Sequence, residues 1–523
     1  MISFLMPMLL TTAIPVGGHP VDAVLGVGQP LPMPLVEVAP EFLASAQEAP
    51  RTAGNQSGPS LDLGVNNWGL SLGNSPVWNG LRINWRDRDI ESINGLNVTL
   101  WAPGESPGGE VNGLALSVAY PGADRINGVA VGLIGSVTRD LFRGVGLGLI
   151  ANVSEGDTIG VRLAGIANVT GRDAMAVEGS FIANVTEGHV HGVRLAGFAN
   201  VSGEMTGVQA ALLANVSEGD TLGAQAALLA VVSGGRQDGV NLAGLATVSE
   251  GDRVGVNLGG LASVAGGSSM GFQGGLLTSL SEGDMGGVSL AGMAVVSQGS
   301  MTGVNIAGFA TVSEGPMIGA QAALFATVTG DEMVGLNVAG FGTVAESGMT
   351  GVNVGGLAVV SGDGQITGVN VAGLGLVGYK GLTGLNVGGF GVISDGPING
   401  LNVSVLTVKS GIGSGDDAFT PGPVSDIELG TINGVTAALY RVHAAEVSGV
   451  SAALIFNRSQ QFTGLAFGGY NGITGRQRGL AVGLINYAQE LQGVQVGLVN
   501  IVPTNPVWAR VLPFVNANFS GVF

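Results

Sequence analysis

The sequence predicts an all-β fold, namely a single-chain β-solenoid (a β-helix or β-roll) with about 16 residues per coil and atypical capping units at both ends. The first observation behind this prediction is a glycine that recurs every sixteen residues, at Gly223, Gly239, Gly255, Gly271, Gly287, Gly303, Gly319, Gly335 and Gly351. Fixed self-similarity of this kind is typical of repeat architectures, in which each unit contacts only its neighbours.

The second observation is the pattern inside one copy, residues 303–318. Val304 and Ile306 flank Asn305, which is the period-2 alternation of a strand, and a small pair, a second apolar run and a Ser-Glu-Gly turn follow. Two short strands and two corners per copy would form one coil, and successive coils would stack at roughly 4.8 Å. We therefore expect the stacked coils to bury thin rows of Val, Leu and Ala.

Composition and charge exclude several classes of function. Glycine contributes 94 of the 523 residues and aromatic residues only 5%, which fits a narrow core with many tight corners. The formal net charge of −18 disfavours nucleic acid and anionic membranes as partners, because an acidic surface repels phosphate groups. The absence of cysteine excludes disulfides, thiol catalysis and Cys-bound zinc.

The N-terminal segments differ in composition from the repeats. Residues 1–23 begin with an apolar run to about Val16, which has the length of a signal-peptide core and is too short to span a bilayer. No Lys or Arg precedes this run, so an unstructured N-terminus is the alternative to a signal peptide. Residues 24–62 are rich in proline and are predicted to form an extended spacer.

The repeats themselves divide into successive segments. Residues 63–112 hold degenerate copies and four of the five tryptophans, and we expect them to be N-terminal capping units. Residues 113–407 form the regular β-repeat array, which a loop insertion at 408–430 interrupts. Copies resume over 431–500 at a spacing of fifteen, and residues 501–523 leave the pattern as a predicted C-terminal cap.

Several motifs resemble one known family. They are Asn79-Gly-Leu-Arg-Ile-Asn-Trp, Gly479-Leu-Ala-Val-Gly-Leu-Ile-Asn, Gly493-Val-Gln-Val-Gly-Leu-Val-Asn and the ending Leu512-Pro-Phe-Val-Asn-Ala-Asn-Phe519. In these motifs the chain is similar to bacterial surface-repeat proteins of the leptospiral type, over roughly residues 63–519. The middle copies depart from that pattern, because Ala-Thr or Ala-Asn follows the large apolar residue. The resemblance implies an exported bacterial protein and supplies no catalytic residues.

Candidate binding residues are few. The acidic Ser-Glu-Gly-Asp turns recur in alternate copies, and a row of their carboxylates could recruit Ca²⁺ or Mg²⁺, although they lack the Gly-Gly-x-Gly-x-Asp calcium nonapeptide. The weak cation candidates are Glu218, Asp220, Glu250, Asp252, Glu282 and Asp284. His189 and His191 beside Glu187, and Asp416 with Asp417 in the insertion, are better explained as solvated surface groups.

The sequence indicates function only in outline. No Ser/His/Asp arrangement, paired-carboxylate pocket or cofactor motif stands out, so we predict no catalysis, no cofactor other than possible Ca²⁺, and no small-molecule substrate. The leading hypothesis is an exported surface or extracellular protein that acts as a structural or adhesive rod. Its partners would be other copies of itself or cell-surface and matrix components.

Two alternatives remain open at this level. One is an outer-membrane protein built as a transmembrane β-barrel, because alternation can be traced through about ten residues of one copy, a membrane-spanning length. Against it, the central copies lack the aromatic girdles of such barrels and keep a constant length of sixteen. The other is an ice- or surface-binding solenoid that uses the column of Thr247, Thr311, Thr327 and Thr343.

Overall fold

A computed structural model of the chain describes residues 58–104, 107–411 and 430–519. These residues form a β-solenoid of about 22 turns with about 16 residues per turn, which confirms the predicted fold class. The chain divides into two compact units: unit 1 ends at Leu276 and unit 2 begins at Leu277. The predicted signal peptide (1–23), most of the spacer (24–62), most of the loop insertion (408–430) and the last four residues lie outside the described residues.

One turn of unit 2 shows how the sequence forms the solenoid. The turn begins with β25 (Met301–Ala307), bends at Gly308 and Phe309, and continues as β26 (Ala310–Ser313). We call strands equivalent to β25 long strands and those equivalent to β26 short strands. The bend at positions equivalent to Gly308 and Phe309 is the apolar corner. The bend after the short strand, residues 314–316 in this copy, is the acidic corner.

In unit 1 the first strands are β1 (Ser60–Val65), β2 (Trp68–Gly73), β3 (Val77–Asn84), β4 (Ser92–Thr99), β5 (Glu110–Ser117), β6 (Gly122–Gly132) and β7 (Gly135–Gly148). The later long strands are β9 (Asp157–Ala164), β11 (Ala174–Ser180), β15 (Thr221–Ala227), β17 (Gln237–Ala243), β19 (Arg253–Gly259) and β21 (Ser269–Gly275). The short strands are β8 (Ala151–Ser154), β10 (Ala167–Thr170), β14 (Ala214–Ser217), β16 (Ala230–Ser233), β18 (Ala246–Ser249) and β20 (Ala262–Ala265). As in β7, the strands β12 (Ala183–Ala196) and β13 (Ala199–Ala211) each run from a short-strand segment through the corner into a long-strand segment without a break.

In unit 2 the long strands are β23 (Met285–Ala291), β25, β27 (Met317–Ala323), β29 (Glu332–Ala339), β31 (Gly348–Gly355), β33 (Ile366–Ala372), β35 (Leu382–Gly388), β37 (Ile398–Ser404) and β39 (Thr431–Ala438). The short strands are β22 (Thr278–Ser281), β24 (Ala294–Ser297), β26, β28 (Ala326–Thr329), β30 (Gly342–Ala345), β32 (Ala358–Ser361), β34 (Gly375–Gly378), β36 (Gly391–Ser394) and β38 (Thr407–Ser410). The unit ends with β40 (Arg441–Ile501), the 3₁₀ turn η1 (Val507–Ala509) and β41 (Val511–Asn518).

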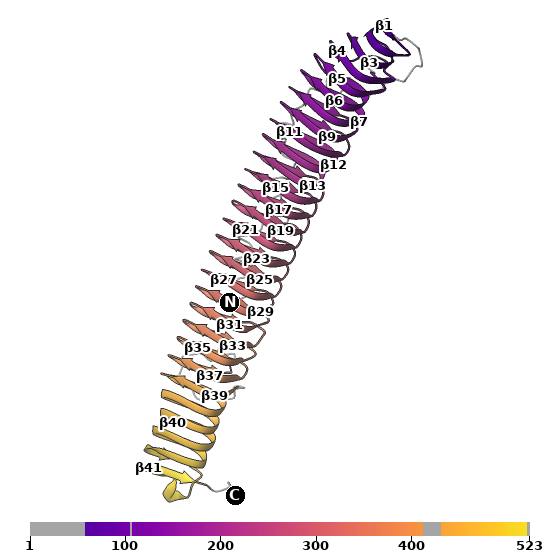
Figure 1. Cartoon of the computed structure of the whole chain (residues 1–523). Coiled ribbons are helices and arrows are strands. Elements are labelled where there is room, and N and C mark those ends of the chain that lie inside the picture. Colours follow the sequence, from indigo (N-terminus) through magenta and orange to yellow (C-terminus); the bar gives the residue numbers. More distant parts are fainter. Residues whose placement is uncertain (1–57, 105–106, 412–429, 520–523) are drawn as a thin grey trace. The chain divides into compact units, whose positions relative to one another are not determined.

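Successive turns pair in parallel and in register. β25 pairs with β27 so that Gly303 faces Gly319, and β26 pairs with β28 so that Thr311 faces Thr327. Long strands therefore lie beside long strands, as β15, β17 and β19 do in unit 1 (Figure 1). This parallel ladder is that of a solenoid. The alternative fold, a transmembrane β-barrel, is built from antiparallel strands, and the described long and short strands do not pair in that way.

The structure reverses the expected inside and outside of the long strands. In β25 the side chains of Asn305 and Ala307 are buried, whereas those of Val304 and Ile306 are 37% and 45% exposed. The expectation that rows of Val and Leu fill the core is therefore wrong for these strands, because their Val and Leu side chains face outward. Period-2 alternation places Asn305 and its neighbours on opposite faces but does not state which face is inside.

The interior holds both polar and apolar columns. In unit 2 the first inward position of the long strand is apolar, and its buried column contains Met285, Met301, Met317, Met333, Met349, Ile366, Leu382, Ile398 and Ile432. The inward positions of the short strand include the threonine column of the ice-binding alternative, Thr247, Thr311, Thr327 and Thr343, and all four are buried. This column therefore offers no surface to ice.

The recurring glycine lies inside the long strand rather than at a corner. Gly303 has φ of +98°, and a β-carbon at this position would overlap the carbonyl oxygen of Gly287 in the preceding turn. The backbone of each long strand therefore has a left-handed kink at this glycine, and the next turn packs directly onto it. This close approach explains why the glycine returns at a fixed interval.

Both ends of the described chain depart from the parallel pattern. At the start of unit 1, β1 pairs antiparallel with β2, and the buried Trp78 donates its indole N–H to the carbonyl of Gly69. At the end of unit 2, β41 pairs antiparallel with the last part of β40. The first strand begins three residues before the expected boundary at residue 63, and β38 continues to Ser410 in the expected insertion.

Candidate functional surface

The acidic corners hold the six predicted cation ligands. Asp220, Asp252 and Asp284 each use Oδ1 to accept a hydrogen bond from the backbone N–H of the residue sixteen positions later, at 2.7 Å in all three cases. The three aspartates lie two turns apart, with a different corner sequence between them. Their carboxylates therefore connect adjacent turns.

Metal-ligating side chains do not gather at these corners. Glu218, Glu250 and Glu282 lie in the same corners as the three aspartates, and within the described ranges no three His, Asp or Glu side chains are arranged to hold a metal ion. His189 contacts Glu204 at 2.8 Å rather than Glu187, and its ring stacks on that of His191 at 4.4 Å. Asp416 and Asp417 lie outside the described residues.

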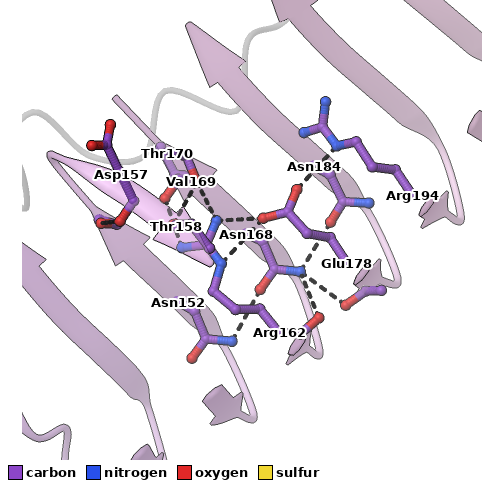
Figure 2. Close-up of polar contacts among 12 residues, drawn as sticks. Asn152, Asp157, Thr158, Arg162, Asn168, Val169, Thr170, Glu178, Asn184 and Arg194 are labelled. Atoms are coloured by element: carbon purple, nitrogen blue, oxygen red, sulfur yellow. Dashed lines mark hydrogen bonds and ion pairs between the residues drawn. The ribbon is translucent and has the colours of Figure 1, made fainter. Parts of the chain in front are cut away.

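Unit 1 contains a buried ionic column that the sequence did not suggest. Arg162, Glu178 and Arg194 occupy the position of Asn305 in three successive long strands, and all three are at most 1% exposed. Arg162 Nη2 lies 2.5 Å from Glu178 Oε1, and Arg194 Nε lies 3.0 Å from Glu178 Oε2 (Figure 2). Arg162 also donates to Val169 O and Thr170 Oγ1.

Two buried arginines, Arg194 and Arg253, have lowered pKa values, but only Arg194 has a carboxylate partner in the described part of the chain. Burial lowers the pKa of Arg194 to about 10, although Glu178 opposes that shift. Burial lowers the pKa of Arg253 to about 9. Among the described residues Arg253 has no carboxylate partner and donates instead to oxygens of Thr247, Ser263 and Val264. Arg194 is therefore paired with a carboxylate, whereas Arg253 is a buried cation without one within the described ranges.

Amide ladders form another part of the polar interior. In the short strands of unit 1, Asn152, Asn168, Asn184, Asn200 and Asn215 form a ladder in which each Nδ2 donates to the Oδ1 of the next, at 2.9–3.0 Å. The same Nδ2 atoms also donate to carbonyls at the end of the long strands, as Asn184 does to Leu195 O at 3.0 Å. Unit 2 has an equivalent long-strand ladder from Asn337 to Asn402. These asparagines therefore have a structural role.

Two of the outward positions of the long strands are apolar in every copy. From Val145 to Val496, the positions equivalent to Val304 and Ile306 hold only Val, Leu, Ile, Phe, Ala or Gly. The apolar corner continues this surface, with Phe309, Phe325 and Phe341 stacked at centroid separations of 4.7 and 4.3 Å. We call the side chains at the positions equivalent to Val304 and Ile306, together with the apolar corner, the apolar face. It recurs in every turn over this range, whereas an ordinary monomer exposes apolar patches of only a few hundred Å².

Each unit has a groove on its apolar face. The groove of unit 1 has a volume of about 1060 Å³ and is lined by residues that include Phe181, Leu195, Leu212 and Leu228. The groove of unit 2 has a volume of about 1190 Å³, with walls that include Val403, Leu439, Leu454, Phe467, Leu484 and Phe514. Both linings also contain several Gly and Ala residues, and neither contains a charged side chain.

The sequence contains a signal for this surface that our interpretation missed. The position of Asn305 holds Asn or Gln in most regular copies, whereas the positions on either side never hold a polar residue from Val145 onward. A column of identical amides in parallel, in-register strands is the pattern of a stacked amide ladder. The alternation therefore placed amides inside and aliphatic side chains outside.

Comparisons with known proteins do not identify the chain. No protein family, curated protein or solved structure gives a significant match. Among the described residues, no helix combines the length and the apolar character needed to cross a membrane.

Proposed function

We propose that this chain is an exported bacterial surface or extracellular protein with a structural and adhesive role, and that its apolar face is the working surface. The observation that carries this proposal is that, within each unit, the outward positions equivalent to Val304 and Ile306 hold only Val, Leu, Ile, Phe, Ala or Gly. Burying these side chains against a partner would contribute about 25 cal/mol for each Å² removed from water. A repeated surface of this kind suits attachment, which gains from many equivalent contacts.

A catalytic role has little support. The buried ionic groups, Arg162, Glu178, Arg194 and Arg253, are closed off from solvent and are held by interior partners. The two grooves contain no nucleophile with a neighbouring base and no charged side chain. We therefore propose a binding protein without enzymatic activity. Its location outside the cytosol rests on the apolar run at residues 1–16 and the resemblance of its motifs.

Two experiments test this proposal. Protease treatment of intact producing cells should remove the protein, and its recovery only from the cytosol would contradict export. Adsorption of the purified full chain should be stronger on a methyl-terminated surface than on a hydroxyl-terminated one, as measured with a quartz-crystal microbalance. Equal adsorption on both surfaces would contradict the adhesive role of the apolar face.

A further inference from the structure

The linings of the two grooves are almost wholly apolar. They contain Gly, Ala, Val, Leu and Phe side chains, and the single hydroxyl in each lining belongs to Ser180 or Ser404. Charged residues are concentrated elsewhere, because the acidic corners carry most of the exposed Asp and Glu of the regular turns. A ligand that fits these grooves is therefore uncharged and apolar along its length.

Backbone hydrogen bonding argues against a peptide as the occupant. An extended peptide brings N–H and C=O groups that need partners when they leave water. The backbone of the lining residues is already paired between turns. Gly244 N donates to Ala227 O at 3.0 Å, and Leu439 N donates to Val405 O at 3.1 Å. A peptide strand bound there would lose hydrogen bonds to water without replacement, whereas a hydrocarbon chain has none to lose.

Charge and register argue against a second copy. Each copy carries a formal net charge of −18, so two copies repel each other at low ionic strength. The apolar face also repeats nearly the same side chains every turn, so a second copy could slide by one turn without losing contacts. Stable protein interfaces combine an apolar centre with polar contacts at the rim, and the apolar face offers few such contacts.

We propose that the apolar face binds lipid, with the grooves taking acyl chains of electrically neutral phospholipids. A neutral headgroup is required because the acidic surface repels anionic lipid. The apolar corner supports this assignment at the start of unit 1, where Trp85 and Trp101 are 66% and 51% exposed at corner positions. Tryptophan prefers the boundary between hydrocarbon and headgroup. This inference rests on the proposed role of the apolar face and names the partner of that face.

Vesicle flotation with the full chain tests the inference. The corner variant replaces four exposed leucines by glutamine: Leu212→Gln, Leu228→Gln, Leu454→Gln and Leu484→Gln. The matched control replaces four exposed apolar side chains that lie near the acidic corner: Met175→Gln, Leu222→Gln, Met270→Gln and Ile318→Gln. The two sets are comparably exposed, since Leu212 and Leu222 are both 56% exposed, and none of the eight side chains fills the core.

The proposal predicts that the wild-type chain floats with phosphatidylcholine vesicles. The corner variant should partition at least about tenfold more weakly, and the control should stay within about twofold of wild type, because lipid affinity scales with buried apolar area. Equal binding by the corner variant and wild type would overturn the proposal, as would binding that requires phosphatidylserine. Thermal unfolding of each variant checks that the fold is retained.

A failure of this inference differs from a failure of the proposed function. If the wild-type chain adheres to methyl-terminated surfaces but does not bind vesicles, the lipid assignment is wrong and the adhesive role stands. If sedimentation shows reversible self-association that the corner variant abolishes, and no vesicle binding occurs, the occupant is a second copy and the lipid assignment is also overturned.

Discussion

At the scale of single residues, polar side chains suit the interior of this solenoid when each can form a hydrogen bond with an identical side chain one turn away. An amide is such a group, because its Nδ2 donates to the next turn while its Oδ1 accepts from the previous one. Burial of Asn184 therefore costs little despite its polarity. The ladder is not continuous, since neither amide atom of Asn305 or Gln321 has a hydrogen-bond partner among the described residues.

The glycine kink gives the first prediction. Gly303→Ala should destabilise the protein by about 2 kcal/mol or more, because alanine is strained at φ of +98° and its β-carbon would meet the preceding turn. Gly375→Ala is the matched control, because nothing lies within 4 Å of a β-carbon there and the equivalent residue one turn earlier is Ala358. The control should change stability by less than about 0.5 kcal/mol. Denaturant unfolding measures both, and equal effects would contradict the role of the kink.

The second prediction concerns the buried charges, and it expects substitutions at two positions to change stability in opposite directions. Glu178→Gln should destabilise the protein by about 3–5 kcal/mol, because Arg162 and Arg194 would lose their shared counter-charge. Arg253→Met should be neutral or stabilising by about 1–4 kcal/mol, because a buried cation without a carboxylate partner is replaced by the residue that fills this column in Met285. A strong loss of stability in Arg253→Met would contradict this account of its burial.

The sequence predicted residue positions better than residue environments. The spacing from Gly223 to Gly351 correctly gave the solenoid and its turn length, because a fixed period is a property of the sequence itself. It did not give the direction of Val304 and Asn305, since alternation only separates two faces and ordinary hydrophobicity then favours the wrong one. The ionic column was also missed, because Arg162, Glu178 and Arg194 resemble surface charges when each is considered alone.

At the scale of elements, the two corners of each turn have different roles. The apolar corner exposes large side chains such as Phe309 while its backbone N–H groups bond to the preceding turn. The acidic corner joins turns through its aspartates, as Asp284 does by accepting from both the backbone N–H and the hydroxyl of Ser300. The turn sequence was predicted correctly, but its carboxylates are committed to backbone groups that no sequence pattern identifies.

The acidic corner gives the third prediction, a dependence of stability on pH. Hydrogen bonds from the backbone and then the side chain of Ser300 lower the pKa of Asp284 from its ordinary value of 3.8. A carboxyl whose pKa is lower in the folded state stabilises the fold above pH 3.8, and this contribution disappears as pH falls through the folded-state pKa. Asp284→Asn should therefore reduce the acid-induced drop in thermal stability below about pH 4. Glu282→Gln, a charge-matched control in the same corner, should reduce it less.

At the scale of the whole molecule, the repeat places the same residue positions inside, and the same positions outside, in many successive turns. Within each unit, the acidic corner, the polar interior and the apolar face each form a continuous column, because parallel in-register pairing places like residues above one another. The sequence therefore predicted the architecture and the negative charge. It did not predict the exposed apolar face, which exists because Val and Leu side chains of the long strands face outward instead of inward.

The most direct test of the reversed arrangement uses the absence of native cysteine. Ile306→Cys and Ala307→Cys are adjacent in β25 and should react at very different rates with a water-soluble maleimide in the absence of lipid. The account predicts that the thiol at position 306 reacts at least about a hundredfold faster, because reaction at position 307 must wait for local opening of the strand. Faster labelling at position 307 than at position 306 would show that the aliphatic side chains face inward and would contradict the apolar face.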